Sequence, residues 1–223
     1  MSAAGLASAA LPVDGTVRVV SDYLYRSYSK SGDAPAPQLQ VWRTLPAGAF
    51  IGLGVSRVDL GDADIEFAPY AGVGWTATPD LRLIATVAGY LYEADLAQRP
   101  GHYVEPSVAL RLRDQGGLRI GWAVDLYGLG SSVPYAEASW RTPFSDVTSA
   151  SLTAGYEHTA AITGDDYGYW NAGVTHYPTP RWALDVRYHG SAGMARRAAS
   201  PQAAFLEPME IGHRVVFSVS FGF

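Results

Sequence analysis

Hydrophobic and polar residues alternate along much of this chain with a period of two. In the stretch 65–75, one set of alternate positions is apolar and the intervening set is small or polar. The apolar set is Ile65, Phe67, Pro69, Ala71, Val73 and Trp75. Successive side chains of a β-strand point to opposite faces of its sheet, so this alternation predicts a strand with one apolar face. The same pattern returns in the stretches 104–112, 118–126 and 182–188.

Weaker alternation in further stretches brings the expected number of strands to about twelve. These stretches are residues 17–25, 38–43, 51–57, 81–92, 133–141, 152–158, 169–177 and 214–223. An even number of strands is typical of single-chain bacterial outer-membrane barrels. Most of the spans approach the roughly 9 to 11 residues that a tilted strand needs to cross a bilayer.

The expected connections alternate between short turns and longer or more polar links. Short turns are predicted at residues 46–49, 78–80, 115–117, 142–146 and 178–180. Longer links are predicted at residues 29–37, 59–64, 94–102, 127–132, 159–166 and 190–211. This alternation is typical of a barrel with one end at the periplasm. We therefore expect an all-β fold: a transmembrane antiparallel up-and-down β-barrel over residues 14–223, located in the bacterial outer membrane with both termini periplasmic.

Residues 1–13 differ from the rest because they are small, apolar and rich in alanine. They contain the A-x-A run Ala7-Ser8-Ala9 but lack the basic region with which a signal peptide begins. We interpret them as a signal-peptide remnant or a flexible N-terminus. A plug-like segment inside the barrel is the alternative.

The composition favours a membrane barrel over a soluble one. Only 17% of the 223 residues are charged, and Lys30 is the sole lysine, whereas about a quarter of a soluble domain is charged. A soluble sandwich or small barrel would turn its apolar face inward and show a Lys- and Glu-rich surface. Apolar runs of roughly 18 residues are absent, which excludes membrane-spanning helices. The net charge of −5 argues against nucleic acid as a partner.

The C-terminal residues alternate up to a terminal aromatic. The apolar set is Val215, Phe217, Val219, Phe221 and Phe223. This pattern resembles the last strand that outer-membrane barrels present to the barrel-assembly machinery. We therefore expect two partners for this strand, the assembly machinery during biogenesis and outer-membrane lipid afterwards.

The N-terminal third resembles a known family. Ser21-Asp22-Tyr23-Leu24-Tyr25-Arg26, then Ser29, then Pro35-Ala36-Pro37-Gln38, is similar to the S-D-Y-x-[FY]-R-G-x-S-Q … P-A-x-Q opening of the TorF-type (Gcw_chp) family of bacterial outer-membrane proteins. The likeness continues through Gly52, Ser56, Val58, Asp59, Glu66, Tyr70 and Gly72, and it departs at Ser27 and Lys30. The resemblance implies an outer-membrane location and a barrel fold. It supplies no catalytic residues, because the family's function is largely unknown.

If the apolar faces contact lipid, the other faces line a lumen. Its charged candidates are Arg18, Asp22, Arg26, Glu66, Arg82, Glu105, Arg111, Arg119, Asp125, Glu137, Arg141, Glu157, Asp185 and Arg187. Interleaved acids and bases in a narrow interior predict a salt-bridged core. A barrel of about twelve strands lies between the filled eight-stranded type and the water-filled sixteen-stranded porins. We expect a narrow passive channel for small solutes or ions; the alternative is a closed barrel with a binding or structural role.

An enzyme is the third alternative, because some outer-membrane barrels are lipid hydrolases that pair a His with a Ser on the lipid-facing surface. The candidates are His158 beside Glu157 and Thr159, His176 near Asn171, and His189 two residues before Ser191. Only the last has the H-x-S spacing, but the alternation turns His189 toward the lumen. We therefore expect no enzymatic activity and no cofactor.

Two further groups have both a functional and a structural interpretation. Asp165 and Asp166 could offer carboxylates to Ca²⁺, although adjacent Asp residues are common turn formers. An aromatic set is expected to form girdles at the headgroup level, with a sugar-binding stripe in the lumen as the alternative. This set is Tyr23, Tyr25, Tyr90, Tyr92, Tyr127, Tyr135, Tyr156, Tyr167, Tyr169, Trp170 and Tyr177.

Overall fold

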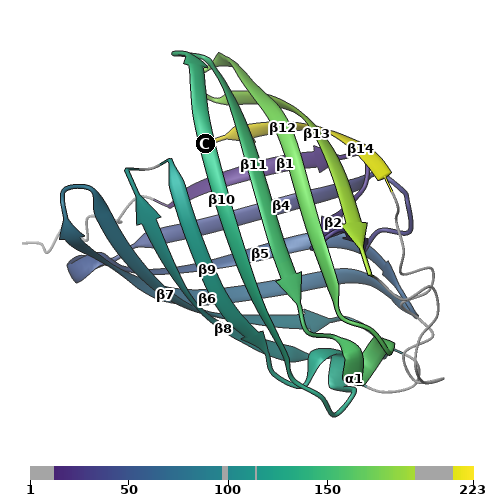
Figure 1. Cartoon of the computed structure of the whole chain (residues 1–223). Helices are drawn as coiled ribbons and strands as arrows, with labels where there is room; N and C mark the ends of the chain where they lie inside the picture. Colours follow the sequence, from purple (N-terminus) through teal and green to yellow (C-terminus); the bar gives the residue numbers. More distant parts are fainter. Residues whose placement is uncertain (1–12, 97–99, 114, 194–212) are drawn as a thin grey trace, which may run out of the picture.

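The computed structural model describes residues 13–96, 100–113, 115–193 and 213–223 (Figure 1). In these residues twelve antiparallel strands form one closed barrel, which confirms the predicted fold class. The wall strands are β1 (Asp14–Val20), β4 (Ala36–Thr44), β5 (Ala49–Leu60), β6 (Ala63–Thr78), β7 (Leu81–Tyr92), β8 (Tyr103–Leu112), β9 (Gly116–Ala123), β10 (Val133–Ser145), β11 (Thr148–Glu157), β12 (Tyr167–Thr179), β13 (Trp182–Ala192) and β14 (His213–Gly222). The segment 1–12 of the expected N-terminal remnant lies outside the described residues.

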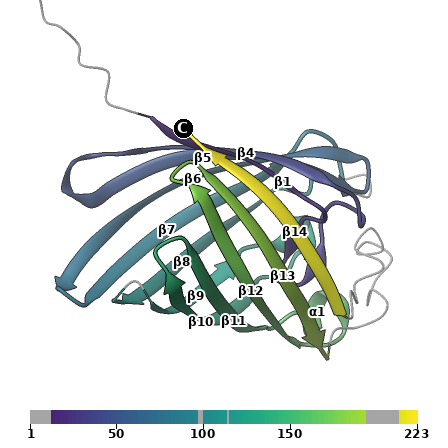
Figure 2. The ribbon, with the colours of Figure 1, turned by 90° about the horizontal axis from the view of Figure 1, so that it is seen from above.

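The barrel closes between its first and last strands. β1 pairs with β14 from Thr16 opposite Gly222 to Val20 opposite Ser218, and on its other side it pairs with β4. Figure 2 shows β14 crossing the wall beside β1. No helix in the described part of the chain has the length and apolar character to span a membrane.

Connection length differs between the two ends of the barrel. Short connections, including the 3-10 turn η1 (Pro46–Gly48), lie at one end together with β1's start and the C-terminal Phe223. The other end carries longer connections, which include η2 (Leu126–Gly128) and the one-turn helix α1 (Ala160–Thr163). We call these the short-turn end and the long-connection end.

One predicted longer link is instead a tight turn. β5 continues to Leu60 and β6 begins at Ala63, so the link predicted at 59–64 is reduced to Gly61 and Asp62. Gly61 has a φ of +60°, a left-handed conformation that glycine adopts without a steric penalty.

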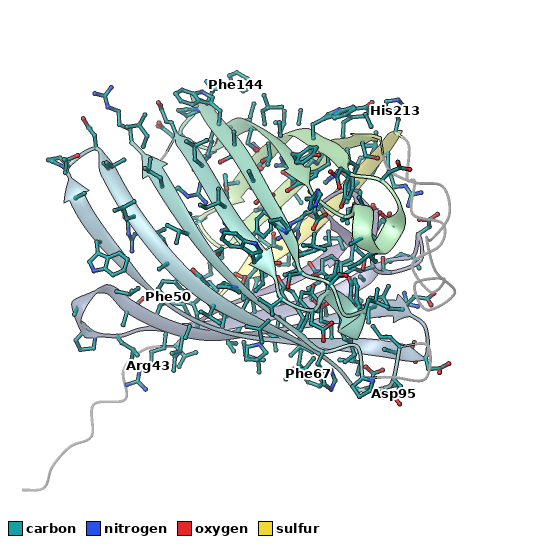
Figure 3. The ribbon with its side chains drawn as sticks, turned by 60° about the horizontal axis from the view of Figure 1, so that its bottom comes forward. Arg43, Phe50, Phe67, Asp95, Phe144 and His213 are labelled. Atoms are coloured by element: carbon teal, nitrogen blue, oxygen red, sulfur yellow. The ribbon has the colours of Figure 1, made fainter. Side chains whose placement is uncertain are left out.

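The outer face of the wall is apolar. Its exposed side chains include Val17, Leu39, Ile51, Phe67, Val87, Val108, Ile120, Trp122, Leu152, Val174, Leu184 and Phe217. Figure 3 shows Phe67 and Phe144 on the outside of the ribbon. A contiguous apolar surface this large is far beyond what a soluble monomer exposes to water. The surface suits a lipid surrounding.

One segment of the chain leaves the wall and folds inside the barrel. The strand predicted at 17–25 ends at Val20, and the link predicted at 29–37 is not an outer loop, because residues 21–35 fold inward. They contain a small hairpin of β2 (Leu24–Tyr25) and β3 (Tyr28–Ser29). Its two turn residues, Arg26 and Ser27, have φ values of 47° and 65°, as a tight two-residue hairpin turn requires. We call residues 21–35 the inner segment.

Candidate functional site: the inner segment and an arginine-lined cavity

The tip of the inner segment is held by two carboxylates from wall strands that are separated by β9 and β10. The Arg26 guanidinium lies 2.8 Å from Glu105 on β8 and 2.8 Å from Glu157 on β11. All three side chains are at most 7% exposed. A buried guanidinium is stable only when it is paired, and its planar fork suits two carboxylates.

Tyrosines surround this ion pair and complete its hydrogen bonds. Tyr25 and Tyr135 donate their hydroxyls to Glu105 at 2.5 and 2.8 Å. The Arg26 guanidinium also lies over the Tyr135 ring, 3.3 Å from its centroid. The aromatic face therefore contributes a cation–π attraction in a place that water does not reach.

Lys30, the sole lysine, forms a second buried attachment. Its ammonium is fully buried and lies 2.5 Å from Glu66 on β6, whose side chain is 1% exposed. Tyr92 also donates to this carboxylate, at 2.8 Å. Rings within about 6 Å of the ammonium belong to Tyr23, Tyr25, Tyr90, Tyr92, Tyr103 and Tyr127. The charge is thus neutralised by one carboxylate and surrounded by aromatic faces.

Further contacts attach the inner segment to the last strands of the wall. Asp22 accepts hydrogen bonds from Ser29 at 2.6 Å and from Arg214 of β14 at 2.5 Å. The Ser27 hydroxyl donates to the carbonyl of Gly190 on β13 at 3.1 Å. Together with Glu66, Glu105 and Glu157, these contacts reach around the lumen from β6 to β14.

Apolar packing fills the same end of the lumen. The buried cluster contains Tyr28, Val58, Leu60, Ala63, Tyr92, Leu96, Tyr103, Ala123, Leu126, Tyr127, Val133 and Ile162, each at most 9% exposed. Its members come from the wall, the inner segment and the long connections. With the inner segment in place, this end of the lumen is filled by closely packed side chains.

The predicted aromatic girdle is therefore wrong for most of its members. Tyr23, Tyr25, Tyr90, Tyr92, Tyr127, Tyr135, Tyr167 and Tyr169 lie inside the barrel, packed around the inner segment. Only Tyr156 and Trp170 of the set lie at outward-facing alternate positions of their strands. Tyr177 lies at an inward-facing alternate position of β12, like Tyr167 and Tyr169. Phenol hydroxyls satisfy the buried carboxylates there, a use that strand-end position alone does not reveal.

At the short-turn end the lumen holds an open cavity of about 400 Å³. Arg111 of β8, Arg119 of β9 and Arg141 of β10 line it, and among the described residues Glu137 is the one acidic side chain in the lining. Arg82 of β7 is the direct cross-strand partner of Arg111. In the part of the chain that the structure describes, none of these four arginines forms an ion pair.

The predicted salt bridges are present in the lumen, at Arg26, Lys30, Arg187 and Arg214, but acids and bases are partly segregated between its two ends. Glu66, Glu105 and Glu157 lie at the long-connection end, where they pair with Arg26 and Lys30. Arg82, Arg111, Arg119 and Arg141 of the wall lie toward the opposite end. Period-two alternation gives the face on which a charge lies but not its partner, and the partners here come from a segment outside the wall.

The remaining lumen candidates have structural partners, with one correction. Arg18 donates to Ser218 at 3.0 Å, and Arg187 pairs with Asp185 at 3.0 Å on the same strand. Asp125 does not line the lumen. It lies beyond the end of β9 in an exposed turn with a φ of 53°, where it caps the amide of Gly130.

The histidine candidates for a hydrolase do not meet their predicted partners. Glu157 turns inward to Arg26, and His158 instead pairs with Asp166 at 2.7 Å. His176 contacts Thr148 at 3.0 Å. For the H-x-S pair, neither the Nδ1 atom of His189 nor the hydroxyl of Ser191 has a hydrogen-bond partner in the described residues.

The Asp165-Asp166 pair shapes a surface turn. Asp166 accepts hydrogen bonds from Tyr156 at 2.7 Å, from His158 at 2.7 Å and from the amide of Ala160 at 2.9 Å. These donors, Tyr156 first, lower the pKa of Asp166 to about 2. Asp165 contributes only its backbone carbonyl, to Thr159 and Thr163. The described residues contain no group of three side chains placed to hold a metal ion.

The C-terminal apolar set occupies the outer face of β14. Val215, Phe217, Val219 and Phe223 are between 44% and 59% exposed. Phe221 packs against Trp182 of the neighbouring strand, with ring centroids 5.0 Å apart. This face can contact lipid or another protein.

Comparisons with known proteins agree with the fold. No curated protein sequence matches this chain. Among solved structures, the NanC porin is 9% identical and covers 94% of this chain and 98% of its own, with a TM-score of 0.60. The KdgM porin in complex with disordered oligogalacturonate is 8% identical (95% and 98%, TM-score 0.57). The COG4313 outer-membrane channel from Pseudomonas putida F1 is 13% identical (95% and 95%, TM-score 0.57).

These likenesses concern the fold, and the sequence itself gives the family. The profile of the Gcw_chp family, described as bacterial protein of unknown function, matches residues 4–210. The resemblance noted in the N-terminal third is therefore confirmed over nearly the whole chain. The chain belongs to the Gcw_chp family of bacterial proteins.

Proposed function

We propose that this protein is an outer-membrane channel of the porin type, closed at rest by its inner segment. The observation that carries the proposal is a lumen with two unlike ends. One end is filled by the inner segment with Arg26 and Lys30, and the other is an open, polar cavity. Solutes would pass when the inner segment moves aside, so the passive channel expected from the sequence becomes a gated one.

The surroundings follow from the same proposal. The apolar outer face would contact outer-membrane lipid, with the short-turn end and both termini toward the periplasm, as in barrels whose short turns are periplasmic. The outward set Val215, Phe217, Val219, Phe221 and Phe223 would be recognised by the barrel-assembly machinery during biogenesis.

A closed barrel with a binding or structural role is the second candidate. The observation in its favour is the number of buried charges that hold the inner segment, since each broken buried pair is strongly destabilising. In that case the inner segment would be a permanent core, and small solutes would reach only the cavity.

Single-channel recording in planar bilayers separates the two candidates. We expect wild type to open rarely. Arg26→Gln should raise the open probability several-fold without changing the unit conductance, because it weakens the attachment and leaves the wall intact. Arg113→Gln is the matched control, because it also removes one arginine charge, in this case from an exposed ion pair with Asp80. Silence of both wild type and Arg26→Gln, with verified membrane insertion, would favour the closed barrel.

A further inference from the structure

The short-turn end of the lumen contains unpaired positive charge. Arg111, Arg119 and Arg141 line one cavity, while Arg26, Lys30, Arg187 and Arg214 elsewhere in the lumen each contact a carboxylate. These three arginines thus share one cavity without forming an ion pair among the described residues, although Glu137 lies opposite Arg119 in the ladder. Arg18 also forms no ion pair, but it donates to Ser218.

The geometry of the strands concentrates this charge. Arg82 and Arg111 are direct cross-strand partners, and like charges placed directly opposite each other destabilise a sheet. Arg119 and Arg141 extend the group across β9 and β10. A bound anion would relieve the repulsion that the wall itself leaves in place.

The cavity also supplies hydrogen-bonding groups and enough room for a solute. Ser139, Ser151 and Thr153 line it beside the arginines. Arg141 is oriented by its bond to Ser149 at 3.0 Å. A volume of about 400 Å³ falls in the range of small-molecule sites. Guanidinium groups bind carboxylate and phosphate oxygens in pairs of hydrogen bonds.

We propose that this cavity is a binding site for a small, multiply charged solute whose negative groups are carboxylates or phosphates. The site extends the proposed function by naming the class of solute that enters the lumen, and it rests on that function only for its transport role. Glu137, which lies directly opposite Arg119 in the ladder, would disfavour solutes that place a negative group beside it. Binding itself requires only the open cavity.

Isothermal titration calorimetry on the full chain in detergent tests the site without any conduction. The probes are citrate and inorganic phosphate at low salt, with glucose as the neutral comparison. Arg111→Gln/Arg119→Gln should weaken binding at least tenfold. Arg113→Gln, which removes a positive charge from an exposed turn outside the cavity, should change it less than twofold. Added sodium chloride should weaken binding, because salt screens charge pairs.

Each outcome bears on the site alone. Binding of citrate or phosphate that depends on the cavity arginines supports the proposal, and the tighter probe identifies the preferred group. Equal binding by Arg113→Gln and the double variant, or no binding of either anion to wild type at millimolar concentration, overturns it. If the double variant does not fold, Arg141→Gln gives the same comparison. Silence in the bilayer would contradict the channel but not this site.

Discussion

Val20 and Ala36 are direct partners across the β1–β4 ladder, although the whole inner segment lies between them in the chain. The wall is therefore complete without residues 21–35. Those residues add neither a strand nor an outer loop to the barrel. They fill its long-connection end and bring two cations to three buried carboxylates, Glu66, Glu105 and Glu157.

Loss of the Lys30–Glu66 pair should destabilise the protein most when it leaves one partner buried, charged and unpaired. Lys30→Met leaves a buried carboxylate without its cation, so the free energy of unfolding should fall by about 3–5 kcal/mol. Lys30→Met/Glu66→Gln should lose less, because no buried charge then remains. Urea unfolding in lipid vesicles gives both values. A double variant as unstable as the single one would contradict this explanation.

Close packing of tyrosine on glycine makes another site sensitive to a single methyl group. A Cβ atom on Gly155 would lie 2.3 Å from the Tyr169 ring, whereas on Gly168 it would meet only a backbone oxygen at 3.7 Å. Gly155→Ala should therefore reduce the free energy of unfolding by about 1–3 kcal/mol. Gly168→Ala is the control and should stay within about 1 kcal/mol of wild type. Similar losses in both variants would rule out a specific clash.

The Asp166 turn should keep its charge in acid. The pKa of Asp166, about 2, lies below the value of about 3.9 for an Asp in an unfolded chain. The charged Asp166 carboxylate therefore stabilises the folded protein fully above about pH 4, and this contribution is lost as the pH falls through about 2. Tyr156→Phe removes the largest donor and should raise the pKa toward 4. Carboxyl ¹³C NMR of labelled protein measures both values. An unchanged pKa in Tyr156→Phe would show that the hydroxyl is not the cause.

The two faces of the wall should respond differently to an added charge. Val219 is 44% exposed on the outer face, and Val219→Arg near the bilayer midplane should cost about 2–4 kcal/mol. Gln40 shares the lumen-facing parity of β4 and hydrogen-bonds to Tyr70. Gln40→Arg should insert nearly as well as wild type. Folding yield into vesicles compares them, and equal yields would mean that the face assignment is incorrect.

The wall of this barrel could be predicted from the sequence, because every wall strand has one face toward the outside. Strong alternation at 65–75 and 215–223 therefore marked both strands and their outer faces. Alternation at 17–25 did not show that the chain leaves the wall after Val20, since a small inner hairpin also alternates. The polar residues that follow resemble a surface loop, because polarity alone does not distinguish a loop in water from a segment that pairs with buried charges.

A signal for the inner segment was nevertheless present in the sequence. Glu66, Glu105 and Glu157 all lie near the same end of their predicted strands, and no lumen-facing wall arginine lies near that end on an adjacent strand. Arg57 of β5 lies there, but it shares the outward-facing alternate positions of Ile51 and Leu53. Buried carboxylates need partners, and the sole lysine, Lys30, lies in a nearby tyrosine-rich segment. Arg111 lies roughly 20 Å further along the strand from Glu105, at about 3.3 Å per residue.

The most direct test of the account replaces residues 21–35 with the two-residue turn Asn-Gly, joining Val20 to Ala36 across their existing pair. Single-channel conductance of this variant should be large and persistent, and wild type should reach the same unit conductance only in brief openings. A variant that folds and inserts but stays as silent as wild type would contradict the central claim that the inner segment closes the lumen.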